Sequence, residues 1–362
     1  MFLQISLNLN QRLLSISCFL TLASNTHSYY VEQLPSPLST LGEGPVWDID
    51  RQCLFYVDIY EVAILRYDYA KNQTYRATID GTPTNFTTIS VIILIQENPD
   101  HFVLGTDNKL SLVQWDGFSK KATFVKFVAD LGQSESNVRF NDGKVDSHGR
   151  LYIGTMLRES LGLNLFGPKE GKFYRFDGRV GGGFYVQRNH VGISNGLTWN
   201  EKLGKMYFID SMAWNVKQYD IAPSGDLCHE QILFSFLVNG RIPRFFPDGM
   251  TSDEAGNLFV ATWYGSRVFK INATDRRIEQ EIWIPATQVT SVAFGGPKLD
   301  ELFVTTSRSD FVDSQLQPGT VPSRPPASGV LFKVKGLNVR GSPMHKMILE
   351  DEDNFLDVVQ CN

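Results

Sequence analysis

The stretch "LYIGT" at residues 151–155 decides the fold, because strings of the same kind recur along most of the chain. Each string is apolar, is rich in β-branched or aromatic residues and ends near Asp or Thr, as buried β-strands often do. Successive strings begin 48, 49, 55, 52 and 44 residues apart. A period near 50 residues is the signature of a repeat architecture. The other strings are "LFYVD" (54–58), "FVLGT" (102–106), "MYFID" (206–210), "LFVAT" (258–262) and "LFVTT" (302–306).

A second strand-like string follows each of these six, and turn residues separate the two, which indicates hairpins. No long amphipathic helix interrupts the pattern, and the intervals leave room for four strands per repeat. We therefore expect an all-β fold, a six-bladed β-propeller in a single domain over residues 29–362. The segment "SYYVEQL" (28–34) is expected to pair with the last blade and close the ring. Two stacked β-sandwiches would not explain one period over the whole chain.

The bulk composition limits the classes of partner. The chain has 362 residues, is 42% hydrophobic and carries a net charge of -5, with no long basic run. Nothing here favours nucleic acid or an anionic membrane surface. The apolar run "VIILI" (91–95) is far too short to span a bilayer. We expect a monomer that binds a small molecule, with neither nucleic acid nor a membrane as partner.

The first 28 residues differ in composition from the rest. Arg12 precedes the apolar run "LLSISCFLTLA" (13–23), and small and polar residues follow it. This order is typical of a signal peptide and predicts secretion, whereas a leader without that role would leave the protein in the cytoplasm. Beyond the leader, three cysteines remain, an odd number without a C-x-x-C pair, which leaves a Cys228–Cys361 bridge open.

Polar residues recur at one position of the repeat. Counting back ten or eleven residues from the start of a landmark string reaches Glu43, Asn141, Asn195 and Asp248, and a glycine follows each within two residues. The same offset reaches Ser291 in the sixth repeat. The inner strands of a propeller line its central channel, so residues in phase should converge there. Asn-Gly and Asp-Gly also mark ordinary turns, but four occurrences in phase favour a site.

Carboxylate and amide oxygens suit a hard divalent cation. None of the six histidines occupies the inner position, which argues against a histidine-rich zinc site. We expect one divalent cation on the propeller axis, with Ca²⁺ as first choice. Zn²⁺, Mg²⁺ or Mn²⁺ would also be compatible with oxygen ligands.

The stretch "GISNGLTW" (192–199) also fits G-x-S-x-G, the pattern of a serine nucleophile elbow. That motif requires a strand–turn–helix context, with an acid and a histidine later in the chain. Here it lies inside an all-β repeat. Since Ser194 and Asn195 face opposite ways in a strand, we interpret Asn195 as the functional residue and Ser194 as a structural one.

At these positions the chain resembles the regucalcin/gluconolactonase family of six-bladed propellers, which includes insect luciferin-regenerating enzymes, and in particular it resembles insect regucalcin-like proteins. The matching motifs are "LGEGPVWD" (41–48), "RFNDGKVDSHGRLYIGTM" (139–156), "SNGLTW" (194–199), "PDGM" (247–250) and "VAFGGPKLDELFVTTSR" (292–308).

The resemblance implies a role for six residues. Glu43, Asn195 and Asp248 would be metal ligands. Substrate contacts fall on Arg139 and Asn141 of "RFND" and on Glu159 of "GTMLRES". The reaction that the resemblance implies is hydrolysis of a sugar lactone of the gluconolactone type to the aldonic acid.

Two further functions use the same sequence features. A calcium-binding regulatory protein with little turnover would need the same ligands, although a pure cation site needs no arginine beside it. An interaction scaffold would also be compatible with a propeller, because one fold hosts many functions. The retained carboxylates favour a hydrolase, in which Asp248 is both a metal ligand and the general base.

Overall fold

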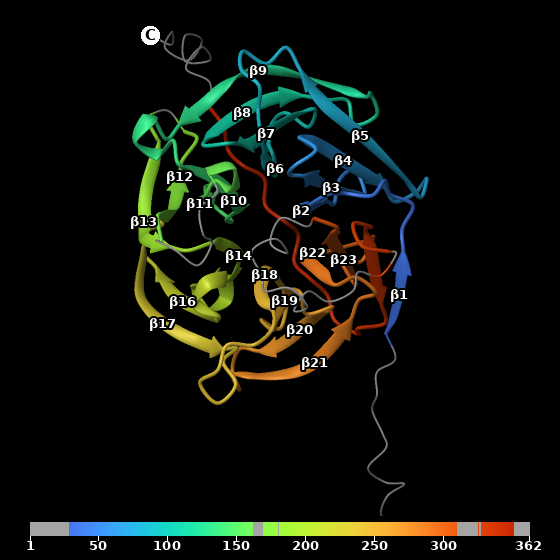
Figure 1. The fold of residues 1–362 in the computed structure, drawn as a ribbon, viewed down its shortest axis with the longest axis vertical. Coiled ribbons are helices and arrows are strands. Elements are labelled where there is room, and N and C mark those ends of the chain that lie inside the picture. Colours follow the sequence, from blue (N-terminus) through green and yellow to red (C-terminus); the bar gives the residue numbers. More distant parts are fainter. Residues whose placement is uncertain (1–28, 162–168, 180, 310–324, 326, 351–362) are drawn as a thin grey trace, which may run out of the picture.

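The structure is a computed structural model that describes residues 29–161, 169–179, 181–309, 325 and 327–350. The predicted leader (1–28) lies outside this part of the chain, as does Cys361 and with it the bridge considered above. The described residues form an all-β, propeller-like arrangement (Figure 1), as the repeat predicts. Helical structure in the described part consists of four short 3₁₀ turns: η1 (Gln133–Glu135), η2 (Glu159–Leu161), η3 (Glu201–Leu203) and η4 (Ser211–Ala213).

Four of the described sheets have four strands each. The first is β10 (Val138–Val145), β11 (Leu151–Leu157), β12 (Gly171–Phe176) and β13 (Phe184–Val191). The second is β14 (Ser194–Asn200), β15 (Lys205–Asp210), β16 (Asn215–Ile221) and β17 (Leu227–Ser235). The third is β18 (Phe246–Ser252), β19 (Leu258–Trp263), β20 (Arg267–Asn272) and β21 (Arg277–Trp283). The fourth is β22 (Gln288–Gly295), β23 (Glu301–Ser307), β24 (Phe332–Lys335) and β1 (Tyr30–Gln33).

The remaining sheet has eight strands. It joins an antiparallel unit, β2 (Gly42–Asp48), β3 (Cys53–Asp58), β4 (Ala63–Asp68) and β5 (Gln73–Asp80), to a second one, β6 (Ile89–Leu94), β7 (His101–Thr106), β8 (Lys109–Gln114) and β9 (Lys121–Asp130). The link is a parallel pairing of β5 with β9 at residues 78–80 and 121–123. Six blades therefore require that this sheet be divided between β5 and β9.

The innermost strands surround a common axis. In Figure 1, β2, β6, β10, β14, β18 and β22 lie nearest the centre, and β5, β9, β13, β17, β21 and β1 lie at the rim. Each inner strand contacts the next, and β22 contacts β2, so the ring is closed. The six landmark strings form the second strand of each unit, β3, β7, β11, β15, β19 and β23.

Aromatic side chains fill the space between neighbouring sheets. Phe173 of β12 stacks on Phe208 of β15, with ring centroids 4.3 Å apart. Trp47 of β2 stacks on Phe303 of β23 at 5.2 Å. These rings are almost fully buried, and each removes a large apolar area from water. The landmark strings are buried on both faces because sheets cover them on both sides.

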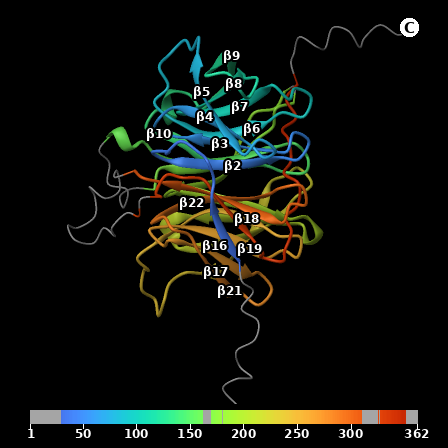
Figure 2. The same ribbon diagram turned by 90° about the vertical axis from the view of Figure 1, so that its right-hand side faces the viewer.

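Two chain ends tie the ring together. Strand β1 pairs antiparallel with β24, from Tyr30 opposite Lys335 to Gln33 opposite Phe332. This pairing confirms the expected closure by residues 28–34. Residues 341–350, drawn in red, run across the centre of Figure 1 and along one face in Figure 2. No helix among the described residues is long and apolar enough to cross a membrane.

Candidate active site

Four of the predicted site residues, Glu43, Asn141, Asn195 and Asp248, lie at β-bulges in the inner strands. On β2, Glu43 pairs with Val57 and Val46 pairs with Phe55. The inner strand therefore advances three residues while its partner β3 advances two. The same slip occurs in β10 after Phe140, in β14 after Ser194 and in β18 after Pro247. A bulge re-aims side chains out of the regular alternation. The extra residue is what turns these polar groups toward the channel.

Two of the glycines that follow the polar positions, Gly196 and Gly249, permit close approach of neighbouring inner strands. A Cβ on Gly196 would lie 2.5 Å from the backbone nitrogen of Met250, in the next sheet. A Cβ on Gly249 would lie 2.0 Å from the Ser291 Oγ, again in the next sheet. Gly44 instead has a positive φ of 57°, which glycine adopts without strain. The recurring glycines thus serve the packing around the axis.

All six predicted site residues line one cavity. Its empty volume, which includes the open space at its mouth, is about 640 Å³. The lining residues lie in or beside the units β2–β5, β10–β13, β14–β17 and β18–β21: Leu41, Glu43, Tyr60, Arg139, Asn141, Met156, Glu159, Ile193, Asn195, Ser211, Met212, Phe246, Asp248 and Trp263.

Three carboxylates gather at the axis. Burial, followed by the charges of Asp248 and Asp142, raises the pKa of the Glu43 carboxyl well above its usual range. Burial and the charge of Asp142 likewise raise the pKa of Asp248. Buried like charges disfavour ionisation. A cation between Glu43 and Asp248 would reverse this effect by favouring the carboxylate forms.

Asn195 presents an oxygen to the same region. Its Nδ2 donates to the Ser211 Oγ at 3.0 Å, and the Ser211 hydroxyl donates to the Pro247 carbonyl at 2.7 Å. These bonds hold the amide with its Oδ1 buried, and that oxygen accepts no hydrogen bond from a described residue. A buried acceptor without a partner is costly and is suited to ligate a cation.

The Arg139 guanidinium and the Glu159 carboxylate form a buried ion pair. Arg139 Nε donates to Glu159 Oε2 at 2.8 Å, and Nη2 also contacts Oε1. Tyr60 donates its hydroxyl to the same carboxylate at 2.9 Å. Burial raises the pKa of Glu159, but the charge and hydrogen bonds of Arg139 outweigh it, so the pKa lies below its usual range. Glu159 is therefore ionised at neutral pH.

Asn141 extends this network toward the next inner strand. Arg139 Nη1 donates to Asn141 Oδ1 at 2.8 Å. Asn141 Nδ2 in turn donates to the Ser194 carbonyl at 2.8 Å. The three residues predicted to contact substrate are thus bonded to one another.

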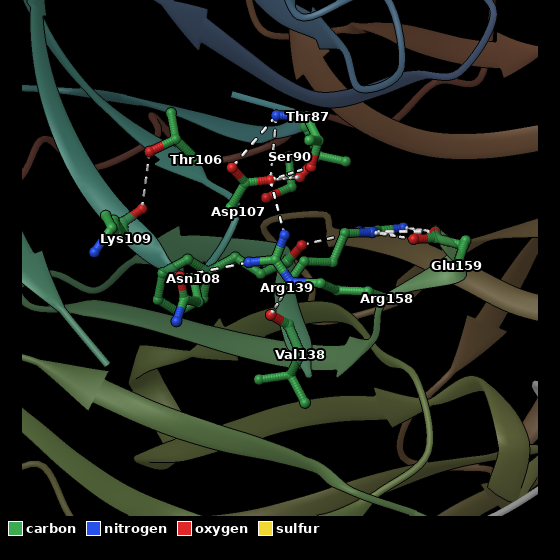
Figure 3. Close-up of polar contacts among 12 residues, drawn as sticks. Thr87, Ser90, Thr106, Asp107, Asn108, Lys109, Val138, Arg139, Arg158 and Glu159 are labelled. Atoms are coloured by element: carbon green, nitrogen blue, oxygen red, sulfur yellow. Dashed lines mark hydrogen bonds and ion pairs between the residues drawn. The ribbon is translucent and has the colours of Figure 1, made fainter. Parts of the chain in front are cut away.

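Glu159 owes its position to its neighbour, Arg158. Figure 3 shows the two side chains reaching different partners, Glu159 to Arg139 and Arg158 to Asp107. Arg158 Nη1 lies 3.2 Å from Asp107 Oδ1, and its Nε donates to the Val138 carbonyl at 3.0 Å. These contacts fix the turn after β11, where Glu159 begins η2.

The residues present fit a divalent cation. Glu43, Asp248 and the unpartnered Oδ1 of Asn195 supply hard oxygen donors at one place on the axis. Among the described residues, no three His, Cys, Asp or Glu side chains form a metal-binding group by themselves. A cation held here would consequently need the amide oxygen beside the two carboxylates.

Ser194 does not line the cavity. Its side chain is fully buried, and its Oγ has no hydrogen-bond partner. It packs on β11, where a Cβ added at Gly154 would lie 2.3 Å from the Ser194 Cβ. No nucleophile geometry surrounds it, which agrees with its interpretation as a structural residue.

Sequence reasoning missed several cavity residues. Met156, Ser211 and Trp263 each follow directly after a landmark string, and Tyr60 follows another by two residues. Their shared place in the repeat is the signal that could have found them. Asp142 was missed because strand alternation turns it away from Asn141, and only the bulge brings its charge near Glu43.

Comparison with known proteins places the chain among relatives of similar length. The model of the SMP-30/Gluconolactonase/LRE-like region matches residues 41–308. Regucalcin of Gallus gallus is 31% identical over 320 residues, covering 87% of this chain and 97% of that protein. Regucalcin of Homo sapiens is 31% identical over 301 residues, covering 83% and 92%.

Solved structures show the same fold. A luciferin-regenerating enzyme is 32% identical and superposes with a TM-score of 0.78, covering 89% of this chain and all (100%) of that one. A calcium-binding regucalcin from Agrobacterium tumefaciens has a TM-score of 0.71 at 21% identity, covering 89% and 98%. A gluconolactonase from Xanthomonas campestris has a TM-score of 0.60 at 16% identity, covering 87% and 92%.

Proposed function

The chain belongs to the SMP-30/gluconolactonase/LRE-like family, and from this premise we propose that it is a metal-dependent lactonase that acts in the axial cavity. The observation that carries the proposal is the convergence of Glu43, Asn195 and Asp248 beside the Arg139–Glu159 pair. A cation site alone would not need a buried arginine lining the same cavity. We also infer six blades, dividing the eight-stranded sheet at the short parallel pairing of β5 with β9.

Glu43, Asn195 and Asp248 would hold the divalent cation, with Ca²⁺ as first choice and Zn²⁺, Mg²⁺ or Mn²⁺ as alternatives. When bound, the cation supplies polarisation of the lactone carbonyl and a lowered pKa for an adjacent water. The water oxygen then bonds to the acyl carbon, the ring C–O bond breaks, and the ring oxygen takes a proton. The product is the open hydroxy acid.

Asp248 is the proposed general base. Its carboxylate lies in the cavity, and burial with the nearby charge of Asp142 raises its pKa well above the usual range of an aspartate. A base is most effective when its pKa lies near the working pH. Asp248 would accept the proton of the attacking water and return it to the leaving oxygen.

Arg139, Asn141 and Glu159 would bind the polar end of the substrate. Because these residues are bonded to one another, their side chains are held in fixed directions. Such preorganisation lowers the cost of orienting a substrate. The sugar lactone implied by family resemblance is the first substrate to assay.

The test is hydrolysis of δ-gluconolactone by residues 29–362 after chelation and single-ion add-back of Ca²⁺, Zn²⁺, Mg²⁺ or Mn²⁺. Acid release above the spontaneous rate, restored by one of these ions, is expected. A protein that binds Ca²⁺ in calorimetry yet opens no lactone with any ion would support the alternative, a calcium-binding regulatory protein with little turnover.

We further propose that the protein is exported, since residues 1–28 have the order of a signal peptide. Expression of the full chain in insect cells, followed by N-terminal sequencing of the medium fraction, tests this proposal. Full-length protein retained in the cytoplasm would contradict it.

A further inference from the structure

The axial cavity has an apolar wall above its polar floor. In the inner strands, residues two positions apart share a face. Two residues before Glu43, Asn195 and Asp248 lie Leu41, Ile193 and Phe246, and all three of these line the cavity. Each blade that supplies a proposed ligand thus also supplies an apolar side chain two positions earlier in the chain.

Other blades extend this wall. Met156 at the end of β11, Met212 in η4 and Trp263 at the end of β19 complete the apolar lining of the described residues. Ile193, Met212 and Trp263 are only partly buried, so the cavity exposes apolar surface. A concave apolar wall around a few convergent polar groups is the usual composition of a small-molecule site.

The polar groups nearby are largely committed to one another. Glu159 accepts from both Arg139 and Tyr60, and the Ser211 hydroxyl accepts from Asn195 while donating to a backbone carbonyl. A sugar lactone brings several hydroxyls, and each hydroxyl that is buried without a partner costs about 1–3 kcal/mol. The described side chains offer few spare partners once Glu43, Asn195 and Asp248 bind a cation.

We propose that the preferred substrate is a lactone that carries an alkyl or aryl group, with its ester at the polar floor and this group against Leu41, Ile193, Phe246 and Trp263. The inference rests on the proposed lactonase function and names its substrate class. The ester oxygens face Glu43, Asn195 and Asp248, and the apolar substituent is transferred from water into contact with the apolar wall. Burial of apolar area then favours this substrate over a hydroxylated ring of equal size.

The experiment compares kcat/KM of the full chain, with its most effective cation, for δ-gluconolactone, δ-valerolactone, δ-nonalactone and dihydrocoumarin. δ-Nonalactone differs from δ-valerolactone only by a butyl group. At about 0.8 kcal/mol per buried methylene, burial of two or more predicts at least a ~10-fold gain for δ-nonalactone. The same margin is expected over δ-gluconolactone.

Variants locate the effect. Ile193→Ala and Phe246→Ala should lower the ratio of kcat/KM for δ-nonalactone to that for δ-valerolactone by ~3-fold or more. Ile232→Ala, the same change at an exposed position of β17, should leave both the ratio and the basal rate unchanged.

The outcomes separate the two proposals. A δ-gluconolactone kcat/KM equal to or above that for δ-nonalactone overturns the substrate class while leaving the lactonase intact. Failure of all four lactones with every cation overturns the lactonase itself. The chain-length comparison uses only the wild-type protein, so it stands even if a variant does not fold.

Discussion

At the scale of single residues, the site consists of side chains whose burial is costly without a partner. Glu43 and Asp248 are 8% and 5% exposed, and burial raises the pKa of both carboxyls. Asn195 adds a buried oxygen without a hydrogen bond. Groups of this kind cluster at functional sites, where a bound ligand offsets the free-energy cost of burying them.

Removal of any one of these three groups should abolish most of the metal-dependent turnover. Glu43→Gln, Asn195→Ala and Asp248→Ala are each expected to lower kcat/KM by at least ~100-fold, because each removes the charge of a ligand, a ligand or the base. Steady-state lactone hydrolysis measures the loss, with circular dichroism as the check on folding. Asp275→Ala, at an exposed surface ion pair, is the control, and near-normal activity of folded Asp248→Ala would refute the mechanism.

Ser194→Ala is expected to change turnover by less than about twofold, because the hydroxyl points away from the cavity. Deleting a buried hydroxyl without a partner is often neutral or stabilising, so thermal unfolding should shift little. Parallel assays of lactone hydrolysis and cation binding measure both effects. If activity disappears while the cation still binds, the nucleophile interpretation of "GISNGLTW" becomes the correct one.

At the scale of elements, a β-bulge and the glycine that follows it form one local structural motif. The extra residue turns a polar side chain toward the axis, and the glycine lets the next inner strand pack closely. A bulge followed by a glycine occurs in β2, β10, β14 and β18, the four inner strands that supply a polar residue to the site. In β10 the glycine, Gly143, packs against Ile153 of its own sheet. The bulge lies at the same position in each of these repeats. For this reason, counting back ten or eleven residues from the landmark string reaches the polar residue each time.

Gly196→Ala should damage both fold and site. The new Cβ would lie 2.5 Å from the Met250 nitrogen and 2.6 Å from the Asp248 carbonyl oxygen, so β18 must shift. Overpacking of this kind costs roughly 1–3 kcal/mol, visible as a lower midpoint in urea and weaker cation binding. Gly183→Ala, where nothing lies within 4 Å of the added atom, is the matched control and should behave as wild type.

At the scale of the whole molecule, two segments from the ends of the chain hold the ring. Strand β1 completes the sheet of β22, β23 and β24. Residues 341–350 contact several blades in turn: Gly341 bonds to Leu299, Met347 to Leu94 and Ile348 to Gly149. Contacts between residues so distant in sequence close the propeller.

Deletion of residues 1–34 should destabilise the protein far more than deletion of residues 1–28. The longer deletion removes β1 and its four residue pairs with β24, and leaves an open edge that also invites aggregation. At about 1 kcal/mol per lost hydrogen bond, the free energy of unfolding should fall by roughly 3–4 kcal/mol. Urea titration of both proteins tests this, and equal midpoints would show that β1 adds nothing to closure.

Deletion of residues 341–362 should lower the melting temperature by roughly 10 °C, since it removes about five hydrogen bonds to separate blades. Deletion of residues 351–362 alone leaves the described segment in place and is expected to preserve the melting temperature. Differential scanning calorimetry compares them. If the protein that lacks residues 341–362 melts at the same temperature as the full-length protein, the blades hold together without this segment.

The amino-acid sequence by itself determined the all-β repeat, the strand strings, closure by β1 and six of the residues that line the cavity, because strand period and repeat phase are local patterns. Only the tertiary structure decided the bulges, the bonding of Arg139 to Glu159, the charge of Asp142 near the axis and the path of residues 341–350. Each of these depends on contacts between segments far apart in the chain, and no local pattern of residues specifies which distant groups will meet. The apolar wall depends on both the sequence and the tertiary structure. The repeat places its residues at equivalent positions, but only the closed ring of inner strands brings them together around one cavity.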